Sequence, residues 1–406
     1  MGKRRANGEG SIFKRKDGLW AAQYTDNTGK KRVLYGKTQQ IAKDKLKEAI
    51  RQSEMGISMD KNKILFIEWL KEWLEVYIKP TTRPKTYALY YGNIYNHIIP
   101  AFPKVLLKDL RADMIQKFLN EKAVSGRLDG KPGGLSISVL KDMRKVITGA
   151  LNQAVDNNII PFNVALRVRL PKETHKEKEI LTREQQQRLE SVALMDDNPL
   201  SFSVLLSLYT GLRIGEIKGL KLDDIDLKKK ELYVRRSVSR VMIPEKGKTE
   251  VIVSEPKTAK GKRTIPLPDF LIELLTDYID KRNRMVEGIQ GYWRGKTAEE
   301  AALWKDEGYL FITLFGTVPD HAAIRRIFER LLKEADIPKV TFHALRHTFA
   351  TRCIEAGFDV KSLSEILGHT DAKMTLNTYT HALEEQKRGN MEKLNDVFTR
   401  DETGEE

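Results

Sequence analysis

The stretch Lys339-Val-Thr-Phe-His343-Ala-Leu-Arg346-His347-Thr-Phe-Ala350, which continues through Leu367-Gly-His369 to Tyr379, organises the rest of the chain. If a helix begins at about His343, then His343 and Arg346 are three residues apart and project from one face. A guanidinium is a permanent cation whose forked donors suit a phosphate, and an imidazole can move a proton near neutral pH. A cation, two imidazoles and a phenol form part of a site that could attack a phosphodiester without a metal.

The composition sets the broad class of the protein. With 406 residues, of which 40% are hydrophobic and 31% charged, the chain should fold into more than one globular domain. Its net charge of +15 favours polyanions, and nucleic acid above all. The single cysteine, Cys353, excludes an intramolecular disulfide and favours the reducing cytoplasm. We find no signal peptide and no apolar run long enough for a membrane helix.

Residues 1–55 are predicted to form a small basic domain of three strands and one helix. Residues 11–16, 19–25 and 31–35 read as strands joined by turns, the first of them an Asp-Gly hairpin turn, and a helix follows from Gln39. Residues 1–52 hold 14 Lys and Arg against five Asp and Glu. A small basic sheet could insert its strands into a DNA groove, and the alternative is a solubilising leader. The candidate DNA contacts are Lys14, Arg15, Lys16, Lys30, Lys31 and Arg32.

Residues 64–168 are predicted to form a helical domain. The residues Phe66, Trp69, Leu70, Trp73, Leu74 and Tyr77 make an amphipathic stripe that is typical of a core helix, which we expect Pro80 and Pro84 to end. Further helices are expected near residues 86–99, 109–122 and 136–157. The candidate phosphate contacts here are Arg83, Lys85, Lys141, Arg144 and Lys145, although single basic residues are more often simply solvated.

Residues 172–400 are predicted to form the third domain, whose first residues, to about Glu179, are a charged interdomain linker. A capping box at Thr182 opens a helix. Helices are expected to about Leu220, strands near residues 231–239 and 262–267, and mostly helices from there to about residue 398. The acidic tail, residues 401–406, is expected to be disordered. The fold class is therefore multidomain α+β, with a small antiparallel sheet in the mainly helical third domain.

Two further segments supply cations. In Thr210-Gly-Leu-Arg213-Ile-Gly-Glu216, the glycine permits a break, Arg213 opens a new helix, and Glu216 could orient its guanidinium one turn later. Residues 255–267 are predicted to form a hairpin with a basic tip. It carries four candidate phosphate contacts, namely Lys257, Lys260, Lys262 and Arg263. A lysine among other cations could also donate a proton.

These motifs, taken together, resemble the tyrosine recombinases. Arg213, Lys257, His343, Arg346, His369 and Tyr379 stand in the order and spacing of that family, within about residues 180–385. The chain looks like a member of the integrase group of phages and conjugative transposons. Its first two predicted domains resemble, more loosely, the arm-binding and core-binding domains of those integrases. Lys257 is the least distinct assignment, because other lysines lie close by.

The resemblance implies a mechanism. Tyr379 attacks a DNA phosphodiester to form a 3′-phosphotyrosine, Arg213 and Arg346 hold the non-bridging oxygens, and His369 hydrogen-bonds the phosphate. His343 accepts the phenol proton, and Lys257 protonates the leaving 5′-oxygen. The covalent intermediate retains the bond energy, so no metal or other cofactor is expected. The implied partners are double-stranded DNA at core and arm-type sites, and three further copies of the chain in a tetramer. A host DNA-bending protein and an excision factor are also implied, and residues 383–398 are expected to dock on a neighbouring protomer.

Three alternatives compete with this interpretation. A type IB topoisomerase-like enzyme would share the phosphotyrosine chemistry without a second DNA partner. A DNA-binding regulator would keep the fold without the chemistry. A zinc site at His343 and His347 is disfavoured, because the metalloprotease pattern needs Glu where Ala344 stands.

Overall fold

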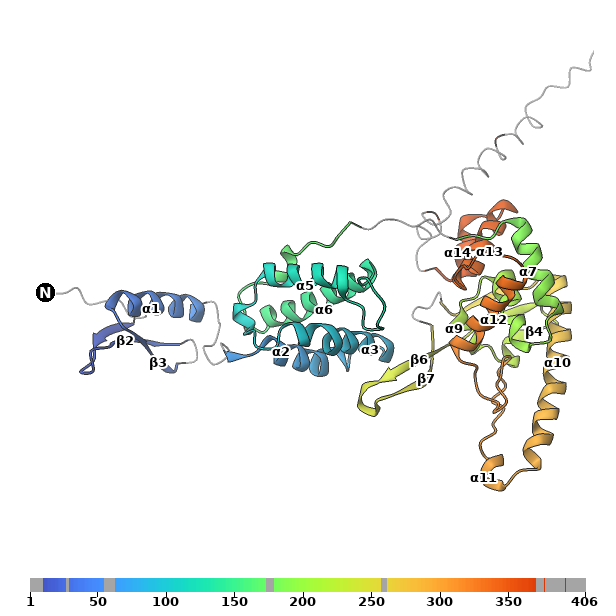
Figure 1. Ribbon diagram of the computed structural model, residues 1–406, viewed down its shortest axis with the longest axis horizontal. Helices are drawn as coiled ribbons and strands as arrows, with labels where there is room; N and C mark the ends of the chain where they lie inside the picture. Colours follow the sequence, from blue (N-terminus) through green and yellow to red (C-terminus); the bar gives the residue numbers. More distant parts are fainter. Residues whose placement is uncertain are drawn as a thin grey trace, which may run out of the picture. The chain divides into compact units, whose positions relative to one another are not determined.

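The computed structural model describes residues 10–26, 29–54, 63–172, 179–256 and 261–369, together with Leu376 and Met391. The chain folds into two compact units, residues 1–175 with 242–248, and residues 176–241 with 249–406. The fold is mostly helical with small antiparallel sheets, as the sequence predicted (Figure 1). Within the described ranges, no helix is both long enough and apolar enough to cross a membrane.

The N-terminal region is a three-stranded antiparallel sheet covered on one face by a helix. The strands are β1 (Ser11–Lys14), β2 (Trp20–Thr25) and β3 (Lys31–Gly36), and the helix is α1 (Gln39–Glu54). Buried Ala22 and Tyr24 of the sheet pack with Leu46 of α1, because alternate strand residues face the same side. The opposite face leaves Phe13 and Tyr35 about half exposed. The predicted three strands and helix are confirmed.

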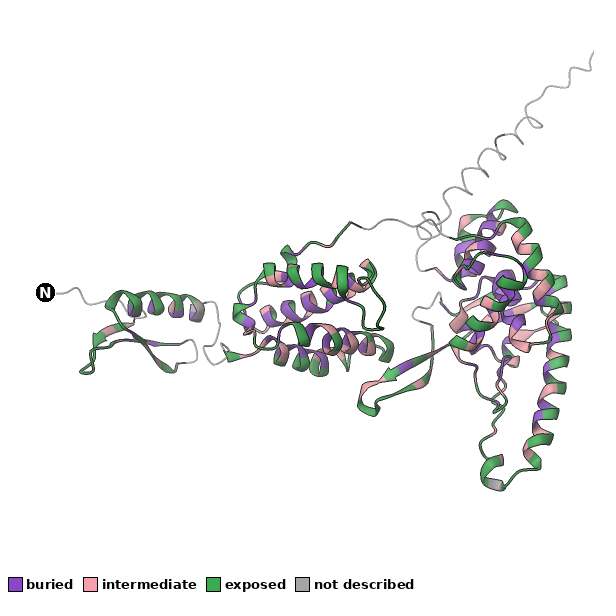
Figure 2. Cartoon of the chain, viewed as in Figure 1, coloured by how far each residue is buried: buried purple, intermediate pink, exposed green. Residues whose placement is uncertain are grey.

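A bundle of helices follows. Its elements are α2 (Phe66–Trp73), the π-helical turn η2 (Leu74–Ile78), α3 (Pro84–Asn93), the π-helical turn η3 (Ile94–Ile98), α4 (Ile99–Ala101), the 3-10 turn η4 (Leu107–Asp109), α5 (Ala112–Ser125), α6 (Ile137–Asp156) and the 3-10 turn η5 (Val164–Arg167). The predicted aromatic stripe is buried except for Tyr77, which is partly buried, and the indole N–H of Trp69 donates to the carbonyl of Ala150 in α6 at 2.8 Å. Figure 2 shows buried residues along the length of α6, which forms the centre of this core. Pro84 opens α3 rather than ending a helix, since its missing N–H has no partner to lose at a first helical position.

The second unit carries the Arg213, His343–Arg346 and His369 motifs on a mainly helical scaffold. Its helices are α7 (Arg183–Met195), α8 (Phe202–Thr210), α9 (Ile214–Gly219), α10 (Asp269–Arg294), α11 (Ala298–Ala301), α12 (His321–Glu334), α13 (His343–Glu355) and α14 (Val360–Leu367), with 3-10 turns at Pro199–Ser201 and Leu222–Asp224. A further 3-10 turn, Pro244–Lys246, lies within residues 242–248 of the first unit. Its strands are β4 (Ile225–Asp226), β5 (Glu231–Val234), β6 (Ser237–Ile243), β7 (Lys248–Ser254) and β8 (Arg263–Pro266). Nearly every residue of α8 is buried, and its buried Ser203, Ser207 and Thr210 hydroxyls donate to backbone carbonyls. α13 packs against α8, so two of the sequence motifs lie on neighbouring helices.

The strands differ from the predicted hairpin at residues 255–267. β8 pairs with β5 in a sheet with β4, and β6 pairs with β7 in a separate two-stranded ribbon. The chain reverses at residues 244–247, where Gly247 adopts a φ of 60°. The predicted hairpin is therefore wrong, because β7 and β8 lie in different sheets. The connection between these strands runs from residue 255 to residue 262, of which the structure describes 255, 256, 261 and 262. The ends of this connection meet, since a Cβ on Gly261 would lie 2.4 Å from Cβ of Pro256.

Candidate active site

Arg213 lies at the junction of two helices. After α8, Gly211 adopts the left-handed conformation with a φ of 65°, and α9 begins directly after Arg213. A Cβ on Gly211 would also lie 2.6 Å from Cδ1 of Phe349, so only glycine fits this turn. The Arg213 backbone N–H donates to Glu216 Oε2 at 3.0 Å, and its Nη1 donates to Oε1 at 2.9 Å. Glu216 therefore orients the Arg213 side chain, which remains 40% exposed.

Glu216 is also the partner of a second arginine. Nη1 and Nη2 of Arg263 donate to its two carboxylate oxygens at 3.2 and 2.9 Å, and both side chains are nearly buried, at 5% and 7% exposed. Burial alone would raise the pKa of Glu216, but the hydrogen bond from Arg263 and the charges of Arg263 and Arg213 lower it to about 2. This geometry disfavours the predicted DNA contact of Arg263, because Nε, Nη1 and Nη2 all donate to acceptors within the protein and its charge is paired with the Glu216 carboxylate.

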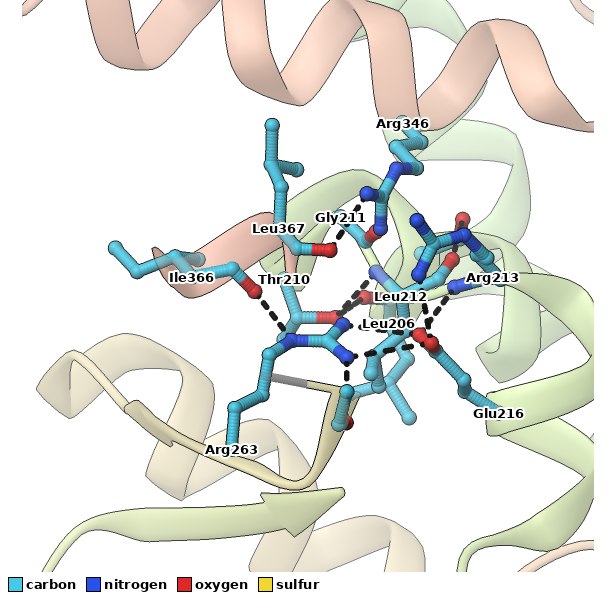
Figure 3. Close-up of polar contacts among 12 residues, drawn as sticks. Leu206, Thr210, Gly211, Leu212, Arg213, Glu216, Arg263, Arg346, Ile366 and Leu367 are labelled. Carbon is cyan, nitrogen blue, oxygen red and sulfur yellow. Dashed lines mark hydrogen bonds and ion pairs between the residues drawn. The ribbon is translucent and has the colours of Figure 1, made fainter. Parts of the chain in front are cut away.

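Arg346 joins the same turn from the opposite side (Figure 3). It lies in the first turn of α13 and is only 2% exposed. Its Nη1 donates to the carbonyl oxygen of Gly211 at 2.7 Å, and its Nη2 donates to the carbonyl oxygen of Leu367 at 2.6 Å. These bonds fix the guanidinium between the end of α8 and the end of α14. The arginines of two separate sequence motifs are thereby brought to one place.

His369 follows the end of α14. Gly368 caps this helix with a φ of 64°, and the His369 N–H donates to the carbonyl oxygen of Ser364 at 3.0 Å. Burial of the half-buried imidazole, followed by the charges of Arg346, Arg213 and Arg263, lowers its pKa to about 4. The imidazole of His369 is therefore neutral at physiological pH and lies within electrostatic reach of all three guanidiniums.

His343 is the first residue of α13, which confirms the predicted helix start. Its side chain is exposed, and its ring lies 4.7 Å from that of His347 in a T-shaped arrangement. His343 and Arg346 are one turn apart on the same helix. Among the residues that the structure describes, no three His, Cys, Asp or Glu side chains are grouped to hold a metal ion. The cluster instead combines cations with imidazoles, a combination suited to a phosphate diester.

Three of the predicted site residues, Lys257, Lys260 and Tyr379, lie outside the described residues. So do the acidic tail and, Met391 apart, the segment 383–398. Lys262 is described, and its exposed side chain forms an ion pair with Glu255 at 2.9 Å. The structure thus brings Arg213, Arg346 and His369 together and places His343 one turn from Arg346 on α13.

The basic residues of the N-terminal sheet are mostly exposed. Lys14, Lys16, Lys30 and Lys31 are open to solvent, and the guanidinium of Arg15 lies 5.0 Å from the ring of Tyr35 on the uncovered face. Arg32 differs. It is the cross-strand neighbour of buried Tyr24, on the face that α1 covers, and its Nε forms an ion pair with Asp26 at 3.0 Å. Because side chains along a strand alternate between the two faces of the sheet, the sequence could have placed Arg32 and Lys31 on opposite faces. It could also have placed Phe13 and Tyr35 on the uncovered face.

The basic residues of the helical bundle are also accessible. Arg83, Lys85, Lys141 and Lys145 are exposed, and Arg144 is partly so. Lys141 and Arg144 line an open cavity together with Arg167 and Arg169, which the sequence interpretation missed. Their only sequence signal is the short run Arg167-Val-Arg169, which resembles many surface segments.

Comparison with known proteins places this arrangement in context. The Phage integrase family matches residues 179–386, and the N-terminal SAM-like domain of phage integrases matches residues 65–123. A protein of Caldanaerobacter subterraneus subsp. tengcongensis named "Tyrosine recombinase XerC-like" is 30% identical over 386 residues, which cover 92% of this chain and 94% of that relative.

Two solved structures share the fold. The integrase of transposon Tn1549 in complex with a circular intermediate DNA matches with a TM-score of 0.63 and 22% identity, over 82% of this chain and 99% of that one. The lambda integrase tetramer bound to a Holliday junction matches with a TM-score of 0.52 and 20% identity, over 92% and 96% of the two chains.

Proposed function

The chain belongs to the phage integrase family, and from this membership we propose that it is a site-specific DNA recombinase that integrates or excises a mobile element or prophage. In this proposal it cuts and rejoins DNA strands through a 3′-phosphotyrosine intermediate. The family's relatives include tyrosine recombinases, phage integrases and transposases of the Tn916 type, which all support strand exchange as the reaction class.

The observation that carries the proposal is the convergence of Arg213, Arg346 and His369 around the Gly211 turn. Arg346 is held by two carbonyl oxygens, and Arg213 is held by Glu216. Donors that are fixed in advance stabilise a developing charge without reorganising during the reaction. A phosphodiester, whose non-bridging oxygens gain charge when it is attacked, is the substrate that such a cluster suits best.

The proposed reaction has two transfers. In the first, the Tyr379 oxygen bonds to phosphorus while the bond to the 5′-oxygen breaks. His343 takes the phenol proton, and Lys257 gives a proton to the leaving oxygen. Arg213 and Arg346 bind the non-bridging oxygens. In the second transfer, the 5′-hydroxyl of another strand attacks phosphorus and returns a proton to Lys257, while the released Tyr379 oxygen takes back the proton from His343. Atoms and charges balance without a cofactor.

The wider assembly is part of the same proposal. The first three strands bind arm-type DNA, and the helical bundle binds the core site through Lys141, Arg144 and their neighbours. The protein acts as a homotetramer on two duplexes, as the lambda integrase tetramer on a Holliday junction suggests by analogy. Residues 383–398 dock on a neighbouring protomer. A host bending protein and an excision factor complete the complex, and the reaction takes place in the cytoplasm.

Covalent trapping tests the proposal. The substrate is duplex DNA from the junctions of the encoding element, with a nick placed so that the cut fragment diffuses away. Wild-type protein is expected to form an adduct that survives SDS, and Tyr379→Phe is expected to form none. Tyr292→Phe is the matched control, because Tyr292 is a 61% exposed tyrosine on α10, far along the chain from the motifs.

Each outcome has a distinct meaning. An adduct in Tyr379→Phe would assign the nucleophile to another residue. Specific DNA binding with no adduct in the wild type would favour a non-catalytic regulator. An adduct accompanied by relaxation of one duplex, but no exchange between two, would favour the topoisomerase-like alternative.

A further inference from the structure

The C-terminal end of α14 is held by two arginines from different elements. The carbonyl oxygen of Ile366 accepts a hydrogen bond from Nε of Arg263 at 2.5 Å, and that of Leu367 accepts one from Nη2 of Arg346 at 2.6 Å. Figure 3 shows the two guanidiniums approaching these neighbouring carbonyls. Carbonyls at the end of a helix have no partner within the helix and carry partial negative charge, so cations are favoured there. His369 lies two residues beyond this clamp.

Arg263 makes a second set of bonds in the opposite direction. Its terminal nitrogens donate to both carboxylate oxygens of Glu216, and Glu216 in turn holds Arg213. One buried guanidinium therefore contacts the residue that orients Arg213 and the helix end that carries His369. Gly368 fits closely over it, since a Cβ at that position would lie 2.9 Å from Nη1 of Arg263. Side chains packed this tightly transmit a displacement rather than absorb it.

We propose that Arg263 is a positioning residue for strand cleavage. It holds Arg213 through Glu216, and it holds His369 through the end of α14, so that these two side chains keep their positions relative to each other. This inference rests on the proposed recombinase function and adds to it a residue that does not touch DNA. Arg263 also begins β8, two residues after Gly261, where the connection that contains Lys257 closes against Pro256. The same residue thus anchors the base of that connection.

The bonding pattern favours positioning over simple stabilisation. A buried ion pair gives little net stability, because removing two charges from water costs as much as their attraction returns. The geometry of such a pair, by contrast, restricts where its partners can lie, because a guanidinium presents planar, forked donors. Acceptors on three segments fix the plane of Arg263, namely Glu216 in α9, Ile366 in α14 and, more weakly at 3.4 Å, Gly261 just before β8.

The chain offers a matched control for the loss of a buried arginine. Arg282 in α10 is as buried as Arg263. It also donates to one carbonyl, that of Tyr309 at 3.0 Å, and to one carboxylate, that of Asp306 at 2.8 Å. Arg282→Gln therefore removes similar bonds from the same unit without touching the clamp on α14. If Arg263→Gln slows cleavage and Arg282→Gln does not, the effect comes from where the lost hydrogen bonds lie and not from how many are lost.

The experiment measures single-turnover cleavage of the nicked junction DNA by the full chain. Arg263→Gln is expected to cleave about 100-fold more slowly, the loss that follows from a misplacement of about 1 Å. Its affinity for the DNA should stay within about threefold of wild type, because Arg263 is buried and its charge is paired with Glu216. Arg282→Gln should bind and cleave as wild type does. Arg263→Lys keeps the charge but not the fork, and it should recover only part of the rate.

A double variant separates positioning from an independent effect. If Arg263 acts partly through His369, then Arg263→Gln combined with His369→Asn should lose less than the product of the two single losses. In addition, removing the Arg263 charge should raise the pKa of His369 in an NMR titration of Arg263→Gln and leave it unchanged in Arg282→Gln.

The outcomes that overturn the inference are clear. Cleavage by Arg263→Gln within about twofold of wild type, or losses that multiply fully in the double variant, would show that Arg263 does not position His369. If Arg263→Gln does not fold, the cleavage rate is measured for Arg263→Lys instead. A rate equal to that of wild type in this variant overturns the inference. A wild-type protein that forms no adduct at all would reject the proposed function itself, and this inference with it.

Discussion

Nη1 of Arg346 donates to the carbonyl oxygen of Gly211 at 2.7 Å, although 135 residues separate the two in the chain. The bond joins the turn that precedes Arg213 to the first turn of α13. The position of one motif's arginine therefore depends on the backbone of the other motif. A change in either segment should act on both guanidiniums at once.

Replacement of Arg346 should harm both stability and cleavage. In Arg346→Lys a single ammonium cannot reproduce the planar donors that reach Gly211 and Leu367, and a buried carbonyl loses its partner. We expect the free energy of unfolding to fall by about 2 kcal/mol, and cleavage to fall by about 100-fold or more. Urea denaturation and adduct formation measure the two effects.

The control for this variant lies on the same helix. Arg352 donates from Nη2 to the carbonyl oxygen of Leu181 at 2.7 Å, and its other two nitrogens donate to Gln186 and Glu355 rather than to the Gly211 turn. Arg352→Lys should lower stability and spare cleavage. Equal loss of cleavage in both variants would mean that the effect of Arg346→Lys is only a loss of folded protein.

Gly211→Ala should distort the turn before Arg213. Its φ of 65° is strained for any residue with a Cβ, and Phe349 leaves no room. We expect a loss of about 1–2 kcal/mol from the backbone conformation alone, and a further loss from the clash. Cleavage should fall more than DNA binding. Gly288→Ala in α10, where a Cβ meets nothing within 4 Å, should instead stabilise the protein, and destabilisation there would undermine the comparison.

The imidazole of His369 should resist protonation. Its pKa of about 4 is below the ordinary value of 6.5, so between these values the unfolded chain binds a proton that the folded chain does not. Its contribution to stability is therefore constant above pH 6.5 and declines as the pH falls towards 4. An NMR titration should show His369 unprotonated at pH 5.5. A midpoint near 6.5 in the free protein would contradict the burial and the charges described above.

Two neighbouring basic residues of the N-terminal sheet should behave differently. Lys31→Gln should weaken binding to arm-type DNA and reduce the slope of log affinity against log salt by about 1, because an exposed phosphate contact is lost. Arg32→Gln should mainly destabilise the sheet, since it leaves buried Asp26 without that ion pair. Lys47→Gln, which removes an exposed charge from α1, is the control. A smaller salt slope in Arg32→Gln than in Lys31→Gln would reverse the two assignments.

The sequence predicted the parts of the fold that depend on local signals. The Asp17-Gly18 turn marked the first two strands, the aromatic stripe marked α2, and the helix at His343 began where expected. The pairing of β8 with β5 could not be predicted, because the β6–β7 ribbon intervenes and strand partners are set by tertiary contacts.

The sequence predicted which residue types form the candidate site, but not which residues hold them in place. In the sequence, Arg263 looks the same as its neighbour Lys262, since both are basic residues near a presumed turn. Only the fold separates them, with Lys262 at the surface and Arg263 beneath Gly368. Strand alternation could have distinguished Arg32 from Lys31, but no local pattern brings Ile366 to Arg263.

The close approach of Pro256 and Gly261 has a consequence for protein engineering. Because the two ends of this connection already touch, extra residues placed between them would lengthen it without moving Arg263 or the register of β8. Closing a longer loop costs little, about 0.6 kcal/mol for each doubling of its length. Because the connection also contains Lys257, the proposed proton donor, an insertion here should slow strand cleavage while the sheet beneath it stays intact.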